Sequence, residues 1–397
     1  MREVVVALAL RTPVGKAKRG SFAQTRPDEL GAAAVRGIME RASGLDPLRI
    51  GDVIIGCAMP EGEQGMNVGR NIALMAGLPD EVPGMTVNRF CSSGLETVNL
   101  AALKIGAGID DVIIAGGVES MTMIPMGGQR YLPDPGLVAR DPGTYLTMGL
   151  TAERLAVEDE LSREDQDAFA LASHTKALAA IAGGRFVDEI VPVATRLSKP
   201  GDDGKPQVID LVVDTDEGPR ADTSPESLAR LKPAFKQGGT VTAGNASQMS
   251  DGGAALLLTT PEICAELGLA PLARWVGYAV AGVEPEIMGI GPVVAVPKVL
   301  AQTGLKLADM DVIELNEAFA AQSLSVLKRL DLSPDDARIN ANGGAIALGH
   351  PLGCTGAKLA ATALHELKRR EGKYAMVTMC IGTGMGAAGI FERIGNE

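Results

Sequence analysis

Aromatic residues and clusters of positive charge are both scarce in this sequence. Phe, Trp and Tyr make up 3% of its 397 residues, and the formal net charge is −12. Because binding to a phosphate backbone needs clustered Lys and Arg, this charge argues against a nucleic-acid partner, and a phosphate-bearing ligand would need a local basic patch. No apolar run approaches the length that crosses a bilayer, so we expect no membrane insertion.

Cysteine and histidine are also few, and their spacing excludes several kinds of site. The five cysteines include no C-x-x-C pair, which predicts free thiols rather than a disulfide framework or a zinc knuckle. The three histidines lack metal-ligand spacing, so we predict no metal. Free thiols fit a reducing compartment, and the opening run at 4–10 resembles a first strand rather than a signal peptide, so we expect a cytoplasmic protein.

Short runs rich in β-branched residues recur along the chain ahead of segments with helical periodicity. They lie at residues 53–55, 112–114, 312–313 and 375–377. Buried strands that alternate with helices are typical of α/β proteins. A chain of 397 residues with 46% hydrophobic content is long enough for two or three domains with aliphatic cores.

The sequence repeats one layout. Cys91 leads through a helical pattern at 95–105 into the run at 112–117, and His350 leads through a similar pattern at 357–367 into the run at 374–379. Two similar α/β halves are therefore predicted, each with a reactive residue where a helix begins.

A stretch rich in charge, Pro and Asp separates the two halves. We interpret 121–249 as an inserted domain, which leaves 1–120 plus 250–272 for the first half and 273–397 for the second. A helix is predicted over 163–180 within the insertion. Its basic cluster, Arg230, Lys232 and Lys236, is either a solvated face or a phosphate-binding rim.

Cys91 is the first candidate for a reactive residue. It lies in Asn-Arg-Phe-Cys-Ser-Ser-Gly at 88–94, at a predicted strand-to-helix junction. Free backbone N–H groups and the helix dipole lower the pKa of a thiol at such a junction. This motif alone leaves open the alternative of a buried, inert thiol.

Two further side chains lie where a ligand could reach them. His350 occupies a glycine-dense turn at 342–353, which lets the backbone approach a ligand closely. Asn316 follows the strand at 312–313, where parallel sheets bind ligands, with a helix N-cap as the alternative. His174 and His365 lie in helical patterns, so we expect them to be exposed or half-buried and to have no role.

Cys380 ends an apolar strand and precedes a glycine-rich loop. Its thiol should lie beside free backbone N–H groups, an arrangement that makes oxyanion sites. Residues 384–389 match the dinucleotide fingerprint G-x-G-x-x-G. The residues after them are too few for the helix, strand and ribose-binding acid of a Rossmann unit, so a NAD-dependent enzyme is excluded.

Taken together, four segments resemble the thiolase family, in order and along the whole chain. They are Asn-Arg-Phe-Cys-Ser-Ser-Gly, Asn-Glu-Ala-Phe at 316–319, Gly-His-Pro-Leu-Gly-Cys-Thr-Gly at 349–356 and Cys-Ile-Gly-Thr-Gly at 380–384. The resemblance implies a thiolase-like fold, two similar α/β halves in a five-layered α/β/α/β/α arrangement, with an inserted loop domain that binds CoA. It implies that Cys91 takes the acyl group, that His350 accepts its proton, and that Cys380 is the general acid and base at the α-carbon of the acetyl-CoA half.

The resemblance also implies two oxyanion sites and a set of CoA contacts. His350 and a water held by Asn316 would form one oxyanion site, and the backbone N–H groups of Cys91 and Gly382 the other. Ser247 would bond the pantetheine arm and Phe235 would line its tunnel. The remaining predicted contacts are Arg220 and Ser227 at the nucleotide end, with Ala243, Met148, Ala318 and Phe319 completing the substrate site. CoA is then a co-substrate, and no cofactor is bound permanently.

Two subtypes of thiolase share these motifs. Thr147 stands where short-chain biosynthetic members commonly have His, and the segments 288–292 and 316–322 are most similar to degradative members. We therefore favour a 3-ketoacyl-CoA thiolase of fatty-acid β-oxidation over an acetoacetyl-CoA-specific acetyltransferase. A related ketoacyl synthase usually lacks a second reactive cysteine, so Cys380 argues against it. A non-catalytic acyl-CoA-binding protein would be expected to have lost one of the four reactive residues, and Cys91, Asn316, His350 and Cys380 are all present.

The resemblance extends to partners. Thiolases are dimers and tetramers, and residues 121–137 resemble the region through which the tetramers associate. We expect a homodimer or homotetramer that binds acyl-CoA and CoA, and we leave open a β-oxidation hydratase/dehydrogenase partner.

Overall fold

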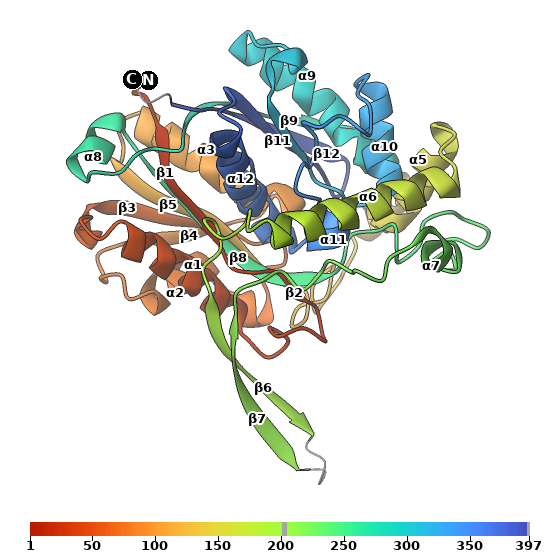
Figure 1. Cartoon of the computed structure of the whole chain (residues 1–397), viewed down its shortest axis with the longest axis horizontal. Coiled ribbons are helices and arrows are strands. Elements are labelled where there is room, and N and C mark those ends of the chain that lie inside the picture. The colour runs from red at the N-terminus through yellow and green to blue at the C-terminus, as the bar shows by residue number, and fades with distance from the viewer. Residues whose placement is uncertain (201–204, 395–397) are drawn as a thin grey trace.

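The computed structural model describes residues 1–200 and 205–394, and its main feature in that part of the chain is one large sheet (Figure 1). The first half supplies β1 (Val5–Arg11), β2 (Gly15–Lys16), β3 (Ile50–Gly56), β4 (Gly84–Val87), β5 (Val112–Ser120) and β8 (Ser250–Thr259). The second half supplies β9 (Ala273–Gly282), β10 (Val312–Leu315), β11 (Tyr374–Ile381) and β12 (Met385–Glu392). The opening run at 4–10 is a strand, as predicted.

The predicted internal repeat is confirmed by the pairing of the strands. In the first half, β3 pairs parallel with β5, and β5, β8 and β1 continue antiparallel. In the second half, β10 pairs parallel with β11, and β11, β12 and β9 continue antiparallel. The two half-sheets join where β1 pairs with β9 at Val5 and Val6.

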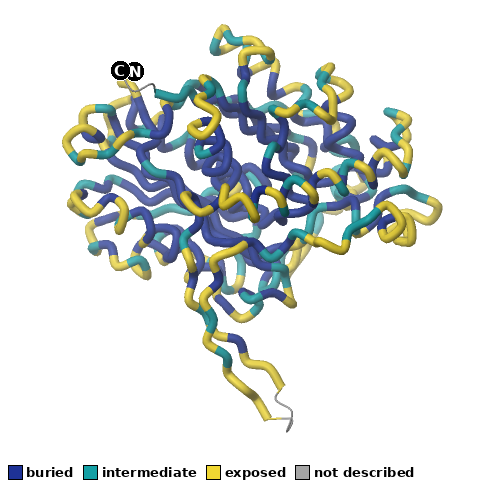
Figure 2. The backbone as a smooth tube through the Cα atoms, viewed as in Figure 1, coloured by how far each residue is buried: buried dark blue, intermediate teal, exposed yellow. Residues whose placement is uncertain are grey.

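Helices form three layers around the half-sheets. On the outer sides lie α1 (Pro27–Arg41) and α2 (Val68–Met75) in the first half, and α9 (Gly291–Thr303) and α10 (Ala320–Arg329) in the second. Between them, α3 (Ser93–Gly106) and α12 (Leu352–Arg369) share one core with strands of both halves. The described residues outside the insertion also form the short α-helices α8 (Pro261–Glu266) and α11 (Ala345–Leu348). This is the predicted five-layered arrangement, and Figure 2 shows its central sheet and helices buried.

Glycines let the two central helices touch. A Cβ on Gly94 of α3 would lie 2.7 Å from the backbone nitrogen of Ala357, and a Cβ on Gly356 of α12 would lie 2.2 Å from that of Leu95. Side chains at either glycine would push the helices apart. Because Cys91 lies two residues before α3 and His350 two residues before α12, this contact brings the two candidate residues toward one another.

The segment interpreted as an insertion lies between neighbouring strands β5 and β8. It contains α4 (Pro135–Arg140), α5 (Met148–Glu158), α6 (Arg163–Ala182), β6 (Val193–Pro200), β7 (Pro206–Val213) and α7 (Pro225–Ala229). The helix predicted over 163–180 is α6. The β6–β7 hairpin extends away from the body of the molecule (Figure 1). Among the described residues, none of the helices is both long and apolar enough to cross a membrane.

Candidate active site

Cys91 lies in a single 3-10 turn, Phe90–Ser92, between β4 and α3. Phe90 has a φ of +44°, a left-handed conformation that is rare for a bulky residue and marks local strain. Two hydrogen bonds hold it there: the Phe90 N–H donates to Asn88 Oδ1 at 2.8 Å, and Ser93 Oγ donates to the Phe90 carbonyl at 2.6 Å. The turn therefore fixes the position of the thiol.

The surroundings of Cys91 differ from the expectation of a lowered pKa. Cys91 is 2% exposed, and burial raises the pKa of its thiol to about 11. The backbone N–H groups of Gly382 and of Cys91 itself point toward the sulfur and lower the pKa only in part. The prediction was wrong because desolvation of a thiolate outweighs a helix N-terminus. Cys91 therefore needs a base to become a nucleophile.

His350 is a buried, neutral imidazole in the loop before α12, which packs against this turn. Its Nδ1 lies 2.6 Å from Thr355 Oγ1, which donates its own hydrogen to the Pro351 carbonyl at 2.8 Å. The Nδ1 nitrogen therefore carries the hydrogen, and the lone pair of Nε2 is the acceptor that could take up a proton. Burial, with a smaller contribution from Lys358, lowers the pKa of His350 to about 3, so the imidazole is neutral around pH 7.

Asn316 directs its side chain to His350 and does not cap a helix. Its Nδ2 lies 3.3 Å from His350 Nε2, and its backbone N–H donates to the Thr378 carbonyl at 3.0 Å. The next helix, α10, begins at Ala320, so the N-cap alternative is wrong. Asn316 Oδ1 is buried and has no hydrogen-bond partner among the described residues, so it can accept a hydrogen bond from a small polar ligand or a water.

Cys380 is the penultimate residue of β11 and is 1% exposed. Burial and the nearby Cys91 both raise the pKa of its thiol, because a second negative sulfur close by is unfavourable. It packs in one apolar cluster with Ala318, Phe319 and Met148, three of the predicted substrate-lining residues. The structure thus brings the second thiol and the predicted acyl-binding residues together.

The predicted CoA segment forms a wall beside this cluster. The Ser247 N–H donates to the Ala318 carbonyl at 3.0 Å, which fastens the segment to the Asn-Glu-Ala-Phe motif. Phe235 contacts Phe319 edge to face, with 5.8 Å between ring centroids. Phe235 is 40% exposed and Phe319 is 8% exposed, so the pair leads from the surface toward Cys380. Ala243 belongs to the same segment and is exposed.

Comparisons with known proteins agree with this geometry. Residues 4–262 match the N-terminal domain and residues 269–393 the C-terminal domain of thiolases. The chain is 53% identical to a 3-ketoacyl-CoA thiolase of Bacillus subtilis, over 99% of this chain and 100% of that protein. The chain belongs to the thiolase family. It is therefore an enzyme, an acyltransferase.

A further relative and a solved structure are also similar to this thiolase along nearly the whole chain. A peroxisomal 3-ketoacyl-CoA thiolase 2 of Arabidopsis thaliana is 46% identical over 98% of this chain and 84% of that protein. An acetyl-CoA acetyltransferase of Bacillus anthracis has a solved structure that matches with a TM-score of 0.88 and 42% identity over 99% of both chains. The likeness confirms the fold that the four motifs predicted.

Other predicted contacts of the thiolase lie on the surface of the insertion, apart from the reactive residues. Arg220 forms an ion pair with Asp222 at 2.8 Å, and Ser227 donates to the Ser224 carbonyl at 2.9 Å. Both predicted residues are exposed. The basic cluster formed by Arg230, Lys232 and Lys236 is exposed as well, in keeping with a solvated face or a phosphate-binding rim.

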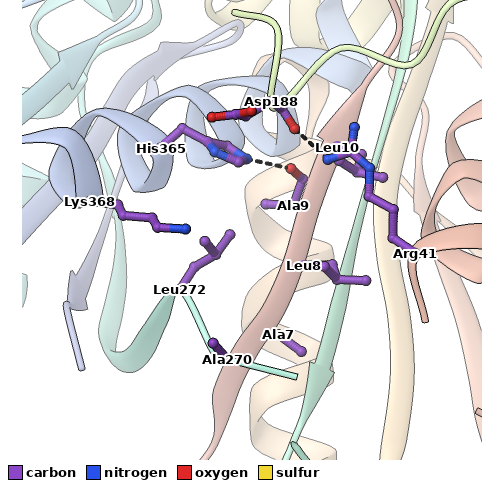
Figure 3. A pocket seen from close by; sticks show the side chains of 10 residues that line it. All are labelled: Ala7, Leu8, Ala9, Leu10, Arg41, Asp188, Ala270, Leu272, His365 and Lys368. Carbon is purple, nitrogen blue, oxygen red and sulfur yellow. Dashed lines mark hydrogen bonds between the residues drawn. The ribbon is translucent and has the colours of Figure 1, made fainter. Parts of the chain in front are cut away.

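Among the described residues, the other two histidines of the thiolase hydrogen-bond to backbone groups. His174 is 5% exposed, contrary to the expectation of an exposed or half-buried side chain, because the segment of Arg220 covers it within the insertion and donates a backbone N–H to its Nδ1 at 3.2 Å. His365 is half-buried, and its Nε2 lies 3.0 Å from the Ala9 carbonyl. It borders a cavity of about 260 Å³ whose lining includes none of the predicted site residues (Figure 3).

Sequence reasoning missed three contributors to the site. Thr355 orients His350 from the first turn of α12, and Met288 packs in the cluster of Cys380. Glu119 is a charged residue in a fully buried strand, and that placement in an apolar run was the available signal.

Proposed function

We propose that this thiolase cleaves 3-ketoacyl-CoA with CoA and releases acetyl-CoA and a shortened acyl-CoA. The observation that supports it best is the convergence of two buried thiols and a neutral imidazole. The first step is attack of Cys91 on the 3-keto carbonyl, while His350 Nε2 takes the thiol proton. The backbone N–H groups of Cys91 and Gly382, which point at the sulfur, would then receive the oxyanion.

Cleavage of the carbon–carbon bond completes the first half of the reaction. The acyl group stays on Cys91, and the departing acetyl-CoA leaves as an enolate. The imidazolium of His350 and a water on Asn316 Oδ1 would stabilise the enolate, and the Cys380 thiol would protonate its α-carbon. In the second half the Cys380 thiolate takes the proton of CoA, the CoA sulfur takes the acyl group, and His350 returns its proton to Cys91. All three residues end in their starting states.

The CoA contacts of the insertion belong to the same proposal. Phe235 contacts Phe319 and Ser247 bonds to Ala318, which suits the pantetheine arm, with Ala243 as a further contact from the same segment. Exposed Arg220 and Ser227 suit the nucleotide end. The proposed division of the chain follows: 121–249 is the CoA-binding insertion between the half with Cys91 (1–120 plus 250–272) and the half with His350 and Cys380 (273–397).

Shortening Phe235 tests the proposed tunnel. Phe235→Ala removes the edge-to-face contact with Phe319 and its apolar area, so we expect the KM for CoA to rise about fivefold to tenfold, with a smaller change in kcat. Phe235→Leu keeps most of the apolar surface and should show a smaller rise. An unchanged KM in steady-state thiolysis assays of Phe235→Ala would remove Phe235 from the CoA site.

The proposed subtype is the degradative one, with a role in fatty-acid β-oxidation. Thr147 is the residue directly before α5, and the apolar side chains of Met148 and Met288 lie in the Cys380 cluster, which suits an alkyl chain. The relative from Bacillus subtilis is named a 3-ketoacyl-CoA thiolase. The alternative is an acetyltransferase confined to four carbons, as the name of the Bacillus anthracis protein suggests.

The deciding experiment compares four-carbon and ten-carbon 3-ketoacyl-CoA as substrates for CoA-dependent cleavage by the purified protein. We expect both to be cleaved. Cleavage of the four-carbon substrate alone would favour the acetoacetyl-CoA-specific enzyme. Binding of CoA without cleavage of either would leave an acyl-CoA-binding protein on a thiolase scaffold.

Assembly and location complete the proposal. We propose a cytoplasmic homodimer or homotetramer. β4 is the last strand at one end of the sheet and all four of its residues are half-buried, which leaves an edge for a second copy. Light scattering should then give a mass of at least twice 41.0 kDa, and a monomer would contradict the proposal. A hydratase/dehydrogenase partner stays a prediction.

A further inference from the structure

Glu119 is a buried carboxylate at the end of β5 whose oxygens join the two halves of the molecule. It is 1% exposed. Its Oε2 accepts the backbone N–H groups of Ala58 and Gly353, both at 2.8 Å. Its Oε1 accepts the Met59 N–H at 3.3 Å and a hydrogen bond from the side-chain amide of Gln64. One side chain therefore bridges the loop near the nucleophile and the loop of the base.

On the side of the base, Glu119 fixes the first turn of α12. The Gly353 N–H is one of the donors that a helix leaves unpaired at its start, and the helix dipole favours a carboxylate there. The same turn carries Thr355, which holds His350 Nδ1 at 2.6 Å. The packing is tight, because a Cβ on Gly353 would lie 2.6 Å from Cys57 Cα. A shift of α12 would therefore move His350.

On the side of the nucleophile, Glu119 connects to the Cys91 turn through two more hydrogen bonds. The Ala58 carbonyl accepts from Asn88 Nδ2 at 3.0 Å. Asn88 Oδ1 in turn accepts the Phe90 N–H at 2.8 Å, and Phe90 is the strained residue directly before Cys91. A continuous chain of contacts thus joins Glu119 to the turn that presents the thiol.

We propose that Glu119 is a positioning residue that holds Cys91 and His350 in place for proton transfer, with Asn88 as its link to the Cys91 turn. The proposal rests on the proposed function for its kinetic readout. Its chemical readout does not, because the rate at which Cys91 reacts with iodoacetamide depends on His350 taking the thiol proton, whatever the natural substrate.

Two other roles for Glu119 predict the opposite result. Burial is the main cause of the raised pKa of Cys91, and the charge of Glu119 adds to it. If charge alone mattered, Glu119→Gln would lower the pKa of Cys91 and speed its alkylation. If Glu119 merely stabilised the fold, its loss would expose the buried thiol and again speed alkylation. Slower alkylation in a folded variant is expected only from displacement of His350 relative to Cys91.

Glutamine cannot replace Glu119 without disturbing the bridge. Each carboxylate oxygen faces two N–H donors, so the amide NH₂ of Glu119→Gln would meet donors wherever it pointed. A matched control is Asp311→Asn. Asp311 Oδ2 also accepts two backbone N–H groups, those of Lys373 at 2.6 Å and Tyr374 at 3.0 Å. These groups lie at the start of β11, whereas Cys380 lies near the other end of that strand.

The experiment measures alkylation of Cys91 by iodoacetamide in the full-length protein, with the modified cysteine identified by peptide mass spectrometry. We expect Glu119→Gln to slow it about tenfold and Asp311→Asn to leave it unchanged. In thiolysis, kcat of Glu119→Gln should fall about 10- to 100-fold, with the KM for CoA within about twofold of the parent value. Circular dichroism melting establishes that each variant is folded.

A second variant keeps the test decisive if Glu119→Gln does not fold. Asn88 is exposed, so Asn88→Ala should fold, and we expect it to slow alkylation of Cys91 about threefold to fivefold. If Glu119→Gln is folded, its alkylation at the parent rate or faster would overturn the proposal. If it is not folded, the same result in Asn88→Ala would overturn it. A parent protein without thiolase activity would contradict the proposed function, while the alkylation rates would still decide the role of Glu119.

Discussion

Replacement of Cys91 by Ala is expected to lower kcat for thiolysis by ~10⁴-fold or more, the largest loss that any single side chain should cause. In the proposed reaction this thiol forms the bond to the acyl group, and no other cysteine lies in its turn. Loss of a small buried side chain should leave the fold intact. The measurement is the steady-state rate of acetoacetyl-CoA cleavage, with folding checked by circular dichroism.

The matched control is Cys264→Ala. Cys264 is also a buried thiol, 1% exposed, but it packs in the core on the outer side of the first half-sheet. We expect it to keep nearly the parent kcat. Cys91→Ala should also still bind CoA, because the proposed CoA contacts lie in the insertion. Residual activity of Cys91→Ala within about tenfold of the control would refute the acyl-enzyme mechanism.

Replacement of Cys380 by Ala should have the second-largest effect, a fall in kcat of ~10³-fold, within the range found for general acid–base groups. It should also separate the two halves of the reaction. The enolate can no longer be protonated at its α-carbon, so cleavage of the carbon–carbon bond fails. Transfer of an acyl group between Cys91 and CoA needs no proton at that carbon, so this partial reaction should survive.

The partial reaction can be followed as exchange of labelled CoA into acetyl-CoA. We expect Cys380→Ala to retain exchange within about tenfold of the parent rate. The remaining difference would arise because the Cys380 thiolate no longer takes the proton of CoA. Cys91→Ala should abolish exchange. Equal loss of cleavage and exchange in Cys380→Ala would mean that the second thiol acts on acyl transfer as well, and the assignment of its role to the α-carbon would be wrong.

Local patterns were sufficient to predict most of the elements. The apolar runs at 53–55, 112–114, 312–313 and 375–377 became β3, β5, β10 and β11, because short β-branched runs flanked by turns have few alternatives. The internal repeat could be recognised in the sequence because both halves have the same order of strands and helices. The match at 384–389 to the dinucleotide fingerprint is not followed by the helix that a Rossmann unit needs, because Met385 begins strand β12.

The errors concern electrostatics and burial, which depend on distant segments. The pKa of Cys91 was expected to fall, and it rises, because strands and helices from both halves exclude water from the thiol. His174 was expected near the surface, and the segment of Arg220 covers it. The role of Glu119 could not be read from its neighbours, since its partners lie 61 and 234 residues away in the chain.

The sequence by itself determined the family and the two similar halves, and it supplied the proposed reactive residues, because these depend on residue type, order and local spacing. Only the tertiary structure decided their protonation and mutual orientation. Contact between α3 and α12 at Gly94 and Gly356 brings Cys91 and His350 together, and burial keeps the imidazole neutral and the thiol protonated. Desolvation depends on the whole surrounding fold, and no local pattern of residues records it.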